Sequence, residues 1–333
     1  MTSPTLTDSE APTAPAPRPR RSAVPVLAVL AVAAIAAVAV GAALGPQHQT
    51  VSAAQTGDEH PAESIRSLPG SFDGFRSLSV AEIGPDGATF AGLGDADPRN
   101  PGAPDRDTVF ELGSITKTFT GALFAEAIER GEVAADDHLS QYLGALEGTP
   151  AGDVTLSSLS QHSSGLPGLG ATAAAGTLSG VLLNENPYAS TTTEQLIADA
   201  AVAPVDPEQC VVYSNFAVSL LGTALVEAAG ADDYATLLEE RLTGPLGMDH
   251  TVVAATADEV PADAVPGFLL NGTQASRWWG EGYLPAGSLT FTTASDVAIW
   301  AQANLDGTAP GAAALEPTAS MAPGAEIGWG WIT

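Results

Sequence analysis

The apolar and polar positions divide the 333-residue chain into three regions. Residues 23–44 form an uncharged and almost wholly apolar run, and residues 1–22 before it are rich in Pro, Thr, Ala and Ser. Residues 45–65 are polar and show neither a helical nor a strand period, which predicts a linker. Strand and helix patterns begin close behind this stretch, so one folded domain is predicted over residues 66–333.

The clearest element of that domain is a helix predicted over residues 114–130. Ile115, Phe119, Ala122 and Leu123 recur at the spacing of one helical face, and an Arg-Gly pair follows as a stop signal. Apolar residues occupy most of the circumference of this helix. We therefore expect it to be buried in the middle of the fold.

Strand patterns lie on both sides of a long helical region. The turn Gly84-Pro85-Asp86-Gly87 predicts one hairpin, and Asn271-Gly272 predicts a second. The predicted strands cover residues 78–83, 88–91, 108–112, 268–270 and 274–278. The predicted helices between them cover residues 156–161, 193–201, 215–229 and 233–242. This order predicts an α/β fold in which a helical lobe is inserted into a sheet.

The apolar run of residues 23–44 predicts a transmembrane or export segment. It is long enough to cross the roughly 30 Å hydrocarbon core of a bilayer, and the arginines just before it predict a cytoplasmic N-terminus. We prefer an uncleaved signal anchor that follows a disordered cytoplasmic tail over residues 1–22. A signal peptide cleaved near Ala53 is the alternative. Both interpretations place the domain outside the cytoplasm, either anchored to the cell membrane or secreted.

The composition argues against several kinds of partner. The formal net charge is −28, whereas nucleic-acid binding depends on basic patches that displace phosphate counterions. The five histidines form no His-Glu-x-x-His motif, and the single Cys210 leaves no Cys/His cluster. A complete dinucleotide fingerprint is also missing from the sequence. We therefore expect no nucleic acid, no metal and no cofactor.

The only lysine of the chain, Lys117, follows Ser114 by three residues at the start of the predicted helix. Residues i and i+3 share a helix face, so the amine is expected within hydrogen-bonding reach of the serine hydroxyl. Burial lowers the pKa of a lysine, which makes the amine a base for a serine nucleophile. The alternative is a serine N-cap followed by a surface lysine.

A second polar group opens the helix predicted over residues 215–229. Tyr213 and Asn215 stand two residues apart, so a phenol and a carboxamide project the same way from an extended segment. The alternative is that Ser214 or Asn215 only caps the helix. The chain has no Gly-x-Ser-x-Gly elbow, which argues against an α/β-hydrolase.

These residues resemble the motifs of the serine β-lactamase and penicillin-binding-protein superfamily, in which Ser-x-x-Lys opens a helix. The tyrosine of the second motif is similar to class C β-lactamases, D-alanyl-D-alanine peptidases and related esterases. The resemblance runs from about residue 72 onward through TVFELGSITKTFT, SQHSSGLPG, VVYSNFAVSLLGTALVEAAG, GPLGMDHT and LPAGSLTFTTASDVAIW. It implies a β-lactamase/transpeptidase-like fold with an antiparallel sheet, flanking helices and an inserted helical lobe.

The resemblance also implies roles for the site residues. Ser114 attacks a carbonyl carbon, and its N–H forms half of an oxyanion hole. Lys117 and Tyr213 share the proton transfers, and Asn215 hydrogen-bonds the substrate amide. The implied activity is that of an extracytoplasmic serine hydrolase that forms an acyl-enzyme with β-lactams, D-alanyl peptides of the cell wall or esters. His162, within SQHSSGLPG, is expected to have a structural role.

The sequence departs from the family toward its C-terminus. Family members carry a third motif there, a Lys or His two residues before a Gly, but no lysine or histidine follows His250. We therefore expect the C-terminal strands to be missing and an open sheet edge to remain. We also expect the chain as given to be catalytically incompetent, since loss of one oxyanion donor lowers a rate roughly 10²- to 10³-fold. The alternative function is a homologue that binds penicillin-like ligands without turnover, or an inactive fragment.

Overall fold

The computed structural model describes residues 49–68, 72, 74–97, 101–208, 211–269, 271–287 and 289–332. Contacts separate residues 1–46 from residues 47–333, and all described residues belong to the second unit. The predicted cytoplasmic tail, the predicted transmembrane segment and Cys210 lie outside the described residues. None of the described helices combines the length and the apolar character that a membrane span needs.

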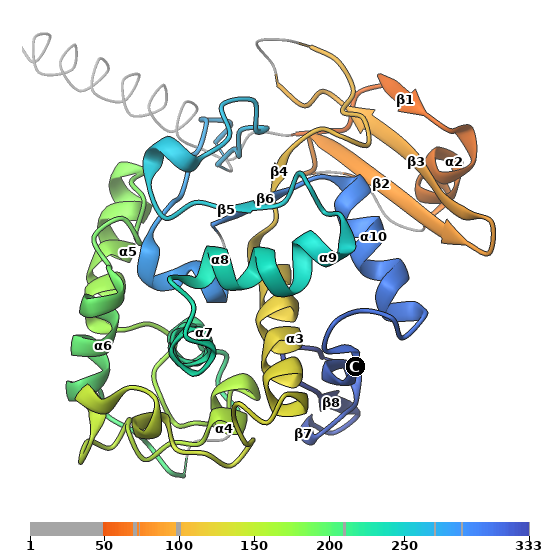
Figure 1. Ribbon diagram of the computed structural model, residues 1–333. Helices are drawn as coiled ribbons and strands as arrows, with labels where there is room; N and C mark the ends of the chain where they lie inside the picture. Colours follow the sequence, from red (N-terminus) through yellow and green to blue (C-terminus); the bar gives the residue numbers. More distant parts are fainter. Residues whose placement is uncertain are drawn as a thin grey trace, which may run out of the picture. The chain divides into compact units, whose positions relative to one another are not determined.

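The predicted helices are found in the structure (Figure 1). The helices are α2 (Glu59–Ser67), α3 (Thr116–Glu129), α4 (Leu156–Ser160), α5 (Ala171–Leu183), α6 (Thr193–Val202), α7 (Asn215–Ala229), α8 (Tyr234–Leu238), α9 (Gly244–Leu246) and α10 (Ala294–Leu305). The predictions for α3, α4, α6 and α7 are confirmed to within about two residues, the usual uncertainty of helix ends. The prediction over residues 233–242 corresponds to α8 and a π-helical turn that follows it. Neither α5 nor α10 was predicted as a separate element.

The strands form three antiparallel sheets in the described part of the chain. They are β1 (Gln55–Gly57), β2 (Ser77–Gly84), β3 (Gly87–Gly94), β4 (Phe110–Glu111), β5 (Val252–Val253), β6 (Thr290–Thr292), β7 (Ala319–Ala322) and β8 (Ala325–Ile327). The strand orders are β1-β3-β2, β4-β6-β5 and β7-β8. The first predicted hairpin is confirmed, because β2 and β3 pair from Ser77 opposite Gly94 to Gly84 opposite Gly87.

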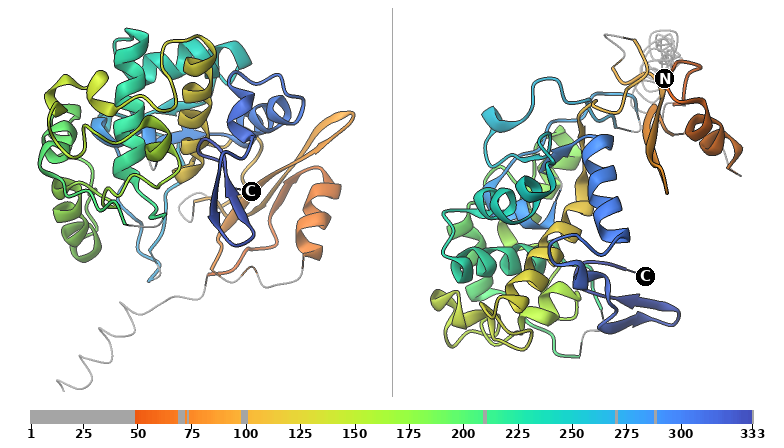
Figure 2. Two further views of the ribbon diagram at one scale, coloured as in Figure 1. Left: turned by 90° about the horizontal axis from the view of Figure 1, so that it is seen from below. Right: turned by 45° about the vertical axis from the view of Figure 1, so that its right-hand side comes forward.

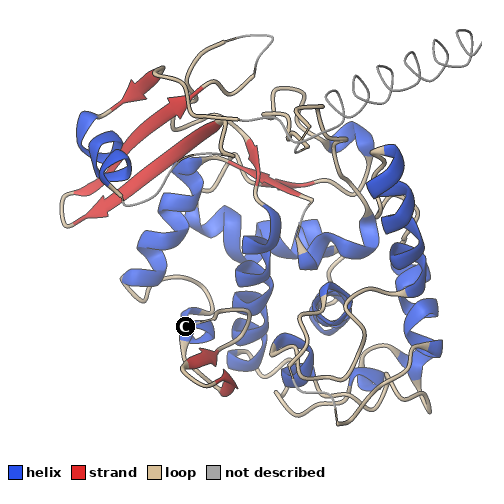
Figure 3. Ribbon diagram, turned by 180° about the vertical axis from the view of Figure 1, so that it is seen from behind, coloured by secondary structure: helices blue, strands red, loops and turns tan. Residues whose placement is uncertain are grey.

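The second sheet is built from strands that precede and follow the helical lobe in the sequence. Strand β4 precedes the lobe and β6 follows it, yet Phe110 of β4 pairs with Thr292 of β6. Strand β5, which comes after the lobe helices, pairs on the other side of β6 with Val252 opposite Phe291. Figure 3 shows these short strands in red beside the blue helices. The prediction of a helical lobe inserted into a sheet is confirmed.

The linker predicted over residues 45–65 needs correction, because β1 and the start of α2 lie within it. Gln55 of β1 pairs with Leu93 of β3 through the backbone. Ala62 of α2 is fully buried and packs with Leu93. A strand held by backbone hydrogen bonds and a helix that buries a small apolar patch leave little periodic signal in the sequence.

The second predicted hairpin, around Asn271-Gly272, is present in a short form, with one bridge between Phe268 and Gln274 among the described residues. Backbone hydrogen bonds of 2.8 Å join its arms from the Leu269 N–H to the Thr273 carbonyl and from the Ala275 N–H to the Gly267 carbonyl. The Asn184 side chain binds one arm of this hairpin. Its amide donates to the Gln274 carbonyl at 2.9 Å, and its oxygen accepts the Ser276 N–H at 2.9 Å. These backbone groups point away from the other arm of the hairpin, so Asn184 ties its outer edge to the end of α5.

Helix α3 lies in the middle of the fold, as predicted (Figure 1). Eleven of its 14 residues are buried. It packs against α7 and against the 3₁₀ segment η6 (Glu281–Ala286). Phe119 meets Trp300 edge to face at 5.3 Å between ring centroids, and Phe124 meets Trp329 in the same way at 5.1 Å. Because α3 begins next to Ser114, this packing fixes the position of the candidate nucleophile.

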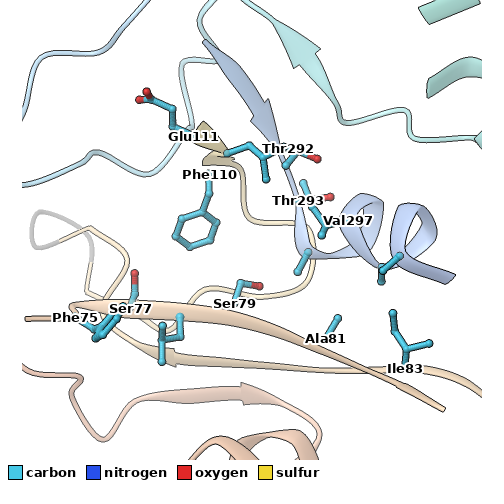
Figure 4. Close-up of a pocket in the computed structure, with 15 residues that line it drawn as sticks. Phe75, Ser77, Ser79, Ala81, Ile83, Phe110, Glu111, Thr292, Thr293 and Val297 are labelled. Carbon is cyan, nitrogen blue, oxygen red and sulfur yellow. The ribbon is translucent and has the colours of Figure 1, made fainter. Parts of the chain in front are cut away.

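An apolar groove lies between β2 and the second sheet. Figure 4 shows alternate side chains of β2, among them Ser79 and Ile83, on the same side as Phe110 and Val297. The groove has a cavity volume of about 470 Å³. In the described residues β2 pairs only with β3, so its other edge is unpaired. None of the four predicted site residues lines this groove.

We predict that Gly121→Ala destabilises the domain. The C-terminal described residues return to α3 next to the β7–β8 hairpin (Figure 2), and a Cβ at Gly121 would overlap the Trp329 carbonyl. Overpacking costs about 1 to 3 kcal/mol, which exceeds the roughly 1 kcal/mol that alanine gains over glycine within a helix. Urea unfolding should therefore give a lower free energy of unfolding.

The matched control is Gly144→Ala. A Cβ at Gly144 meets no atom within 4 Å, so the free energy of unfolding should change by less than about 0.5 kcal/mol. Equal stability of the two variants would contradict the close contact between α3 and the C-terminal residues.

Candidate active site

Ser114 lies where the second sheet meets α3. The Leu112 N–H donates to the Thr290 carbonyl of β6 at 2.8 Å, which ties the chain to the sheet just before the turn. Gly113 then adopts φ +66°, a left-handed conformation that glycine tolerates best. It opens a 3₁₀ turn that leads directly into α3. The Ser114 side chain is exposed, so the candidate nucleophile is accessible.

Lys117 contacts Ser114 from the first turn of α3. Its Nζ lies 3.2 Å from the Ser114 Oγ. The lysine is only 3% exposed, so the surface lysine considered as an alternative is not what the structure contains. Nζ also donates to the carbonyl of Ala286, at the end of η6. The Ala286 carbonyl and the Ser114 hydroxyl hold the Lys117 amine next to the candidate nucleophile.

Burial lowers the pKa of Lys117 to about 7 from its ordinary value of 10.5. The physical cause is loss of hydration, which disfavours the ammonium form. Lys117 makes no ion pair with any carboxylate of the described residues that would offset this effect. Near neutral pH the amine is therefore in part uncharged, as a general base must be.

Tyr213 approaches Lys117 with the face of its ring. The Lys117 Nζ lies 4.7 Å from the ring centroid, which is a cation–π distance when the amine is charged. Within the described part of the chain the Tyr213 hydroxyl makes no hydrogen bond, and the side chain is 46% exposed. The structure thus brings the predicted proton-transfer pair together, although no hydrogen bond links the phenol to the amine.

Asn215 is the first residue of α7, and it does not cap the helix. That role belongs to Ser214, whose Oγ accepts the Ala217 N–H at 2.9 Å. The Asn215 amide donates to the Tyr188 hydroxyl at 3.3 Å. Its Oδ1 is buried and has no hydrogen-bond partner among the described residues. A buried oxygen without a partner is costly, so a ligand N–H donor would be favoured there.

Tyr188 was missed by the sequence analysis. It is 6% exposed, and its ring lies 4.8 Å from that of Tyr283 and 5.5 Å from that of Trp278. Burial raises the pKa of the Tyr188 hydroxyl, so it stays protonated beside Asn215. No motif or spacing signals this tyrosine, because it comes from a segment remote in sequence from both site motifs.

His162 lies beside Tyr213 and is 4% exposed. Burial, and to a lesser degree the charge of Lys117, lower the pKa of His162 to about 4. The imidazole is therefore neutral near pH 7. Its Nδ1 accepts the Ser214 N–H at 3.2 Å, which places the ring proton on Nε2.

A profile of the family described as Beta-lactamase matches residues 65–332. The chain belongs to the β-lactamase family. It is 29% identical over 194 residues to the D-alanyl-D-alanine-carboxypeptidase/endopeptidase AmpH of Escherichia coli K12, with 56% of this chain and 47% of AmpH covered. It is also 29% identical to a β-lactamase of Pseudomonas fluorescens, with 53% and 46% covered. The chain thus spans about half the length of these relatives.

Solved structures share the fold. The chain resembles the D-alanine carboxypeptidase AmpC of Burkholderia cenocepacia with a TM-score of 0.62 and 26% identity, over 77% of this chain and 68% of that one. It resembles a β-lactamase/D-alanine carboxypeptidase of Pseudomonas syringae with a TM-score of 0.66 and 19% identity, over 82% and 73%. The predicted β-lactamase/transpeptidase-like fold is confirmed.

We predict that acylation at Ser114 depends on the ionisation of Lys117. Only the neutral amine accepts a proton, so the acylation rate should rise about tenfold per pH unit below pH 7 and level off above the lysine pKa of about 7. Burst kinetics with an activated ester between about pH 5 and pH 10 measure this profile. A rate that climbs steadily toward pH 10 would contradict the lowered pKa.

Lys117→Arg is the control for this profile. Arginine keeps a positive charge but releases no proton in the working range. The variant should lose acylation by roughly 10²- to 10⁴-fold at every pH while remaining folded. Acylation at the parent rate would mean that Lys117 serves as a fixed charge.

Proposed function

We propose that this protein is a serine hydrolase that forms an acyl-enzyme on Ser114. The observation that carries the proposal is the buried Lys117 amine 3.2 Å from the exposed Ser114 hydroxyl. A serine hydroxyl is a weak nucleophile without an adjacent base. Lys117, with its lowered pKa, is a suitable base near neutral pH.

The contacts of Lys117 suit proton transfer. In the neutral amine one N–H donates to the Ala286 carbonyl, which leaves the lone pair free for the Ser114 proton. As that proton transfers, Ser114 Oγ bonds the substrate carbonyl carbon, and the carbonyl π electrons move to its oxygen. The ring of Tyr213 faces the new ammonium group and stabilises its charge. The carbonyl then re-forms, the bond to the leaving group breaks, and the Lys117 ammonium gives its proton to the leaving group. The Ser114 N–H, at the start of a helical turn, is the proposed oxyanion donor.

The proposed substrates are β-lactams, D-alanyl peptides of the cell wall and esters. Asn215 supports a substrate with an amide, because its buried Oδ1 has no partner in the part of the chain that the structure describes. The names of the relatives, a D-alanyl-D-alanine-carboxypeptidase/endopeptidase and a β-lactamase, support D-alanyl peptides and β-lactams as substrates. The second candidate is a homologue that binds such ligands without turnover. It is favoured by the position of Tyr213, whose ring and not its hydroxyl faces the Lys117 amine.

Mass spectrometry of the full chain tests the proposal. After incubation with a p-nitrophenyl ester or a fluorescent penicillin, the adduct should lie on Ser114 and should be absent from Ser114→Ala. Loss of the label with time indicates a hydrolase, whereas a permanent label indicates the binding protein. An adduct on another residue, or one that persists in Ser114→Ala, would contradict the proposal.

We also propose that the domain lies outside the cytoplasm. This rests on the apolar run of residues 23–44 with arginines before it. Protease added to intact cells should remove the domain and spare residues 1–22. A domain that is protected in intact cells but digested after lysis would reverse the orientation.

A further inference from the structure

His162 contacts the backbone on both sides of Tyr213. We infer that His162 is a positioning residue that holds Tyr213 against Lys117, and so sets the geometry of proton transfer. The inference rests on the proposed function, since it assigns His162 a task within the same site. No hydrogen bond joins His162 to Ser114.

Two hydrogen bonds from His162 hold the chain on either side of Tyr213, and we call this pair of bonds the clamp. The His162 carbonyl accepts the Val212 N–H at 2.9 Å, and the His162 Nδ1 accepts the Ser214 N–H at 3.2 Å. These donors immediately precede and follow Tyr213. One residue therefore fixes the chain before and after the tyrosine, which leaves the Tyr213 backbone little freedom.

The imidazole also packs on the phenol ring. The ring centroids of His162 and Tyr213 are 4.6 Å apart, with an angle of 43° between the ring planes. Among the described residues the Tyr213 hydroxyl makes no hydrogen bond, and the side chain is nearly half exposed. The position of this side chain near Lys117 therefore depends on contacts with its ring, and His162 supplies one of them.

The backbone of His162 is held in an uncommon conformation. Its φ is +59°, and among the described residues only Asn184 shares a positive φ without being glycine. The His162 N–H bonds the Leu159 carbonyl of α4 at 3.4 Å, and the Ser163 N–H bonds the Ser158 carbonyl at 2.9 Å. These two bonds form a Schellman C-cap at the end of α4, which holds the His162 backbone in the left-handed conformation.

Only a neutral imidazole can accept the Ser214 N–H. The charged group that faces His162 from α3 is Lys117, and the phenol that faces it from the chain before α7 is Tyr213. The lysine charge and the burial of the ring both oppose protonation of His162. The clamp is therefore in place throughout the range in which Lys117 acts as a base.

Substitution at His162 tests the inference in the full-length protein. Asparagine tolerates the left-handed conformation, and its Oδ1 reaches the same place as the imidazole Nδ1. Glutamine carries its acceptor one bond further out. His138→Ala is the matched control, because its Nδ1 also contacts a backbone group, the Asp153 carbonyl at 2.7 Å, in a different part of the lobe.

We expect His162→Ala to lower the acylation rate constant at saturating ester about 100-fold, as misplacement of a reacting group does. The apparent dissociation constant of the ester should change little. His162→Asn should acylate within about 10-fold of the parent, and His162→Gln at least about 10-fold more slowly than His162→Asn. His138→Ala should match the parent. The Asn and Gln pair decides the question where His162→Ala does not fold.

Hydrogen exchange of the Ser214 amide is the readout that does not need activity. It should be protected in the parent and in His162→Asn, and should exchange at least about 10-fold faster in His162→Gln. If a folded His162→Gln variant acylates as fast as the parent protein, the positioning role of His162 is overturned. A parent that never acylates would overturn the proposed function alone, and an unprotected Ser214 amide would overturn the clamp.

Discussion

The low hydration of Lys117 is the constraint on which the site depends. An ammonium group loses several kcal/mol when it leaves water without an ionic partner, and the fold buries this one on its most central helix. Burial lowers the pKa of Lys117 to about 7, so the amine is largely neutral above that pH and the cost is reduced. Since the unfolded chain holds the proton to higher pH, this group makes the fold more stable as pH rises from about 7 toward 10.5.

The packing around α3 shields Lys117 from water and holds it next to Ser114. Thr120, one turn further along α3, donates to the Pro285 carbonyl of η6 at 2.6 Å, next to the Ala286 carbonyl that accepts from the lysine. Apolar contacts of α3 with α7 and with the C-terminal tryptophans close the remaining sides. Helix α7 in turn begins at the end of the Tyr213 segment, so the packing of two helices brings both motifs together.

The sequence predicted what depends on local spacing and failed where tertiary contacts decide. The Ser114–Lys117 contact follows from helix geometry, and the burial of α3 follows from its apolar circumference. The contact of Asn184 with the backbone of the Asn271 hairpin could not be predicted, because the two segments are distant in sequence. Tyr188 reaches Asn215 only through the folded lobe. The strand β1 and helix α2 left no period in a polar stretch, since backbone pairing and one small buried patch hold them.

A direct titration of Lys117 tests the central claim most closely. Because Lys117 is the only lysine, protein labelled with ¹⁵N at lysine Nζ gives a single side-chain NMR signal, and its shift with pH reports the pKa without interference. We predict a midpoint near 7 in the folded protein and a return toward 10.5 in denaturant. A midpoint near 10.5 in the folded protein would contradict the account, because a lysine that stays charged at neutral pH cannot act as the base for Ser114.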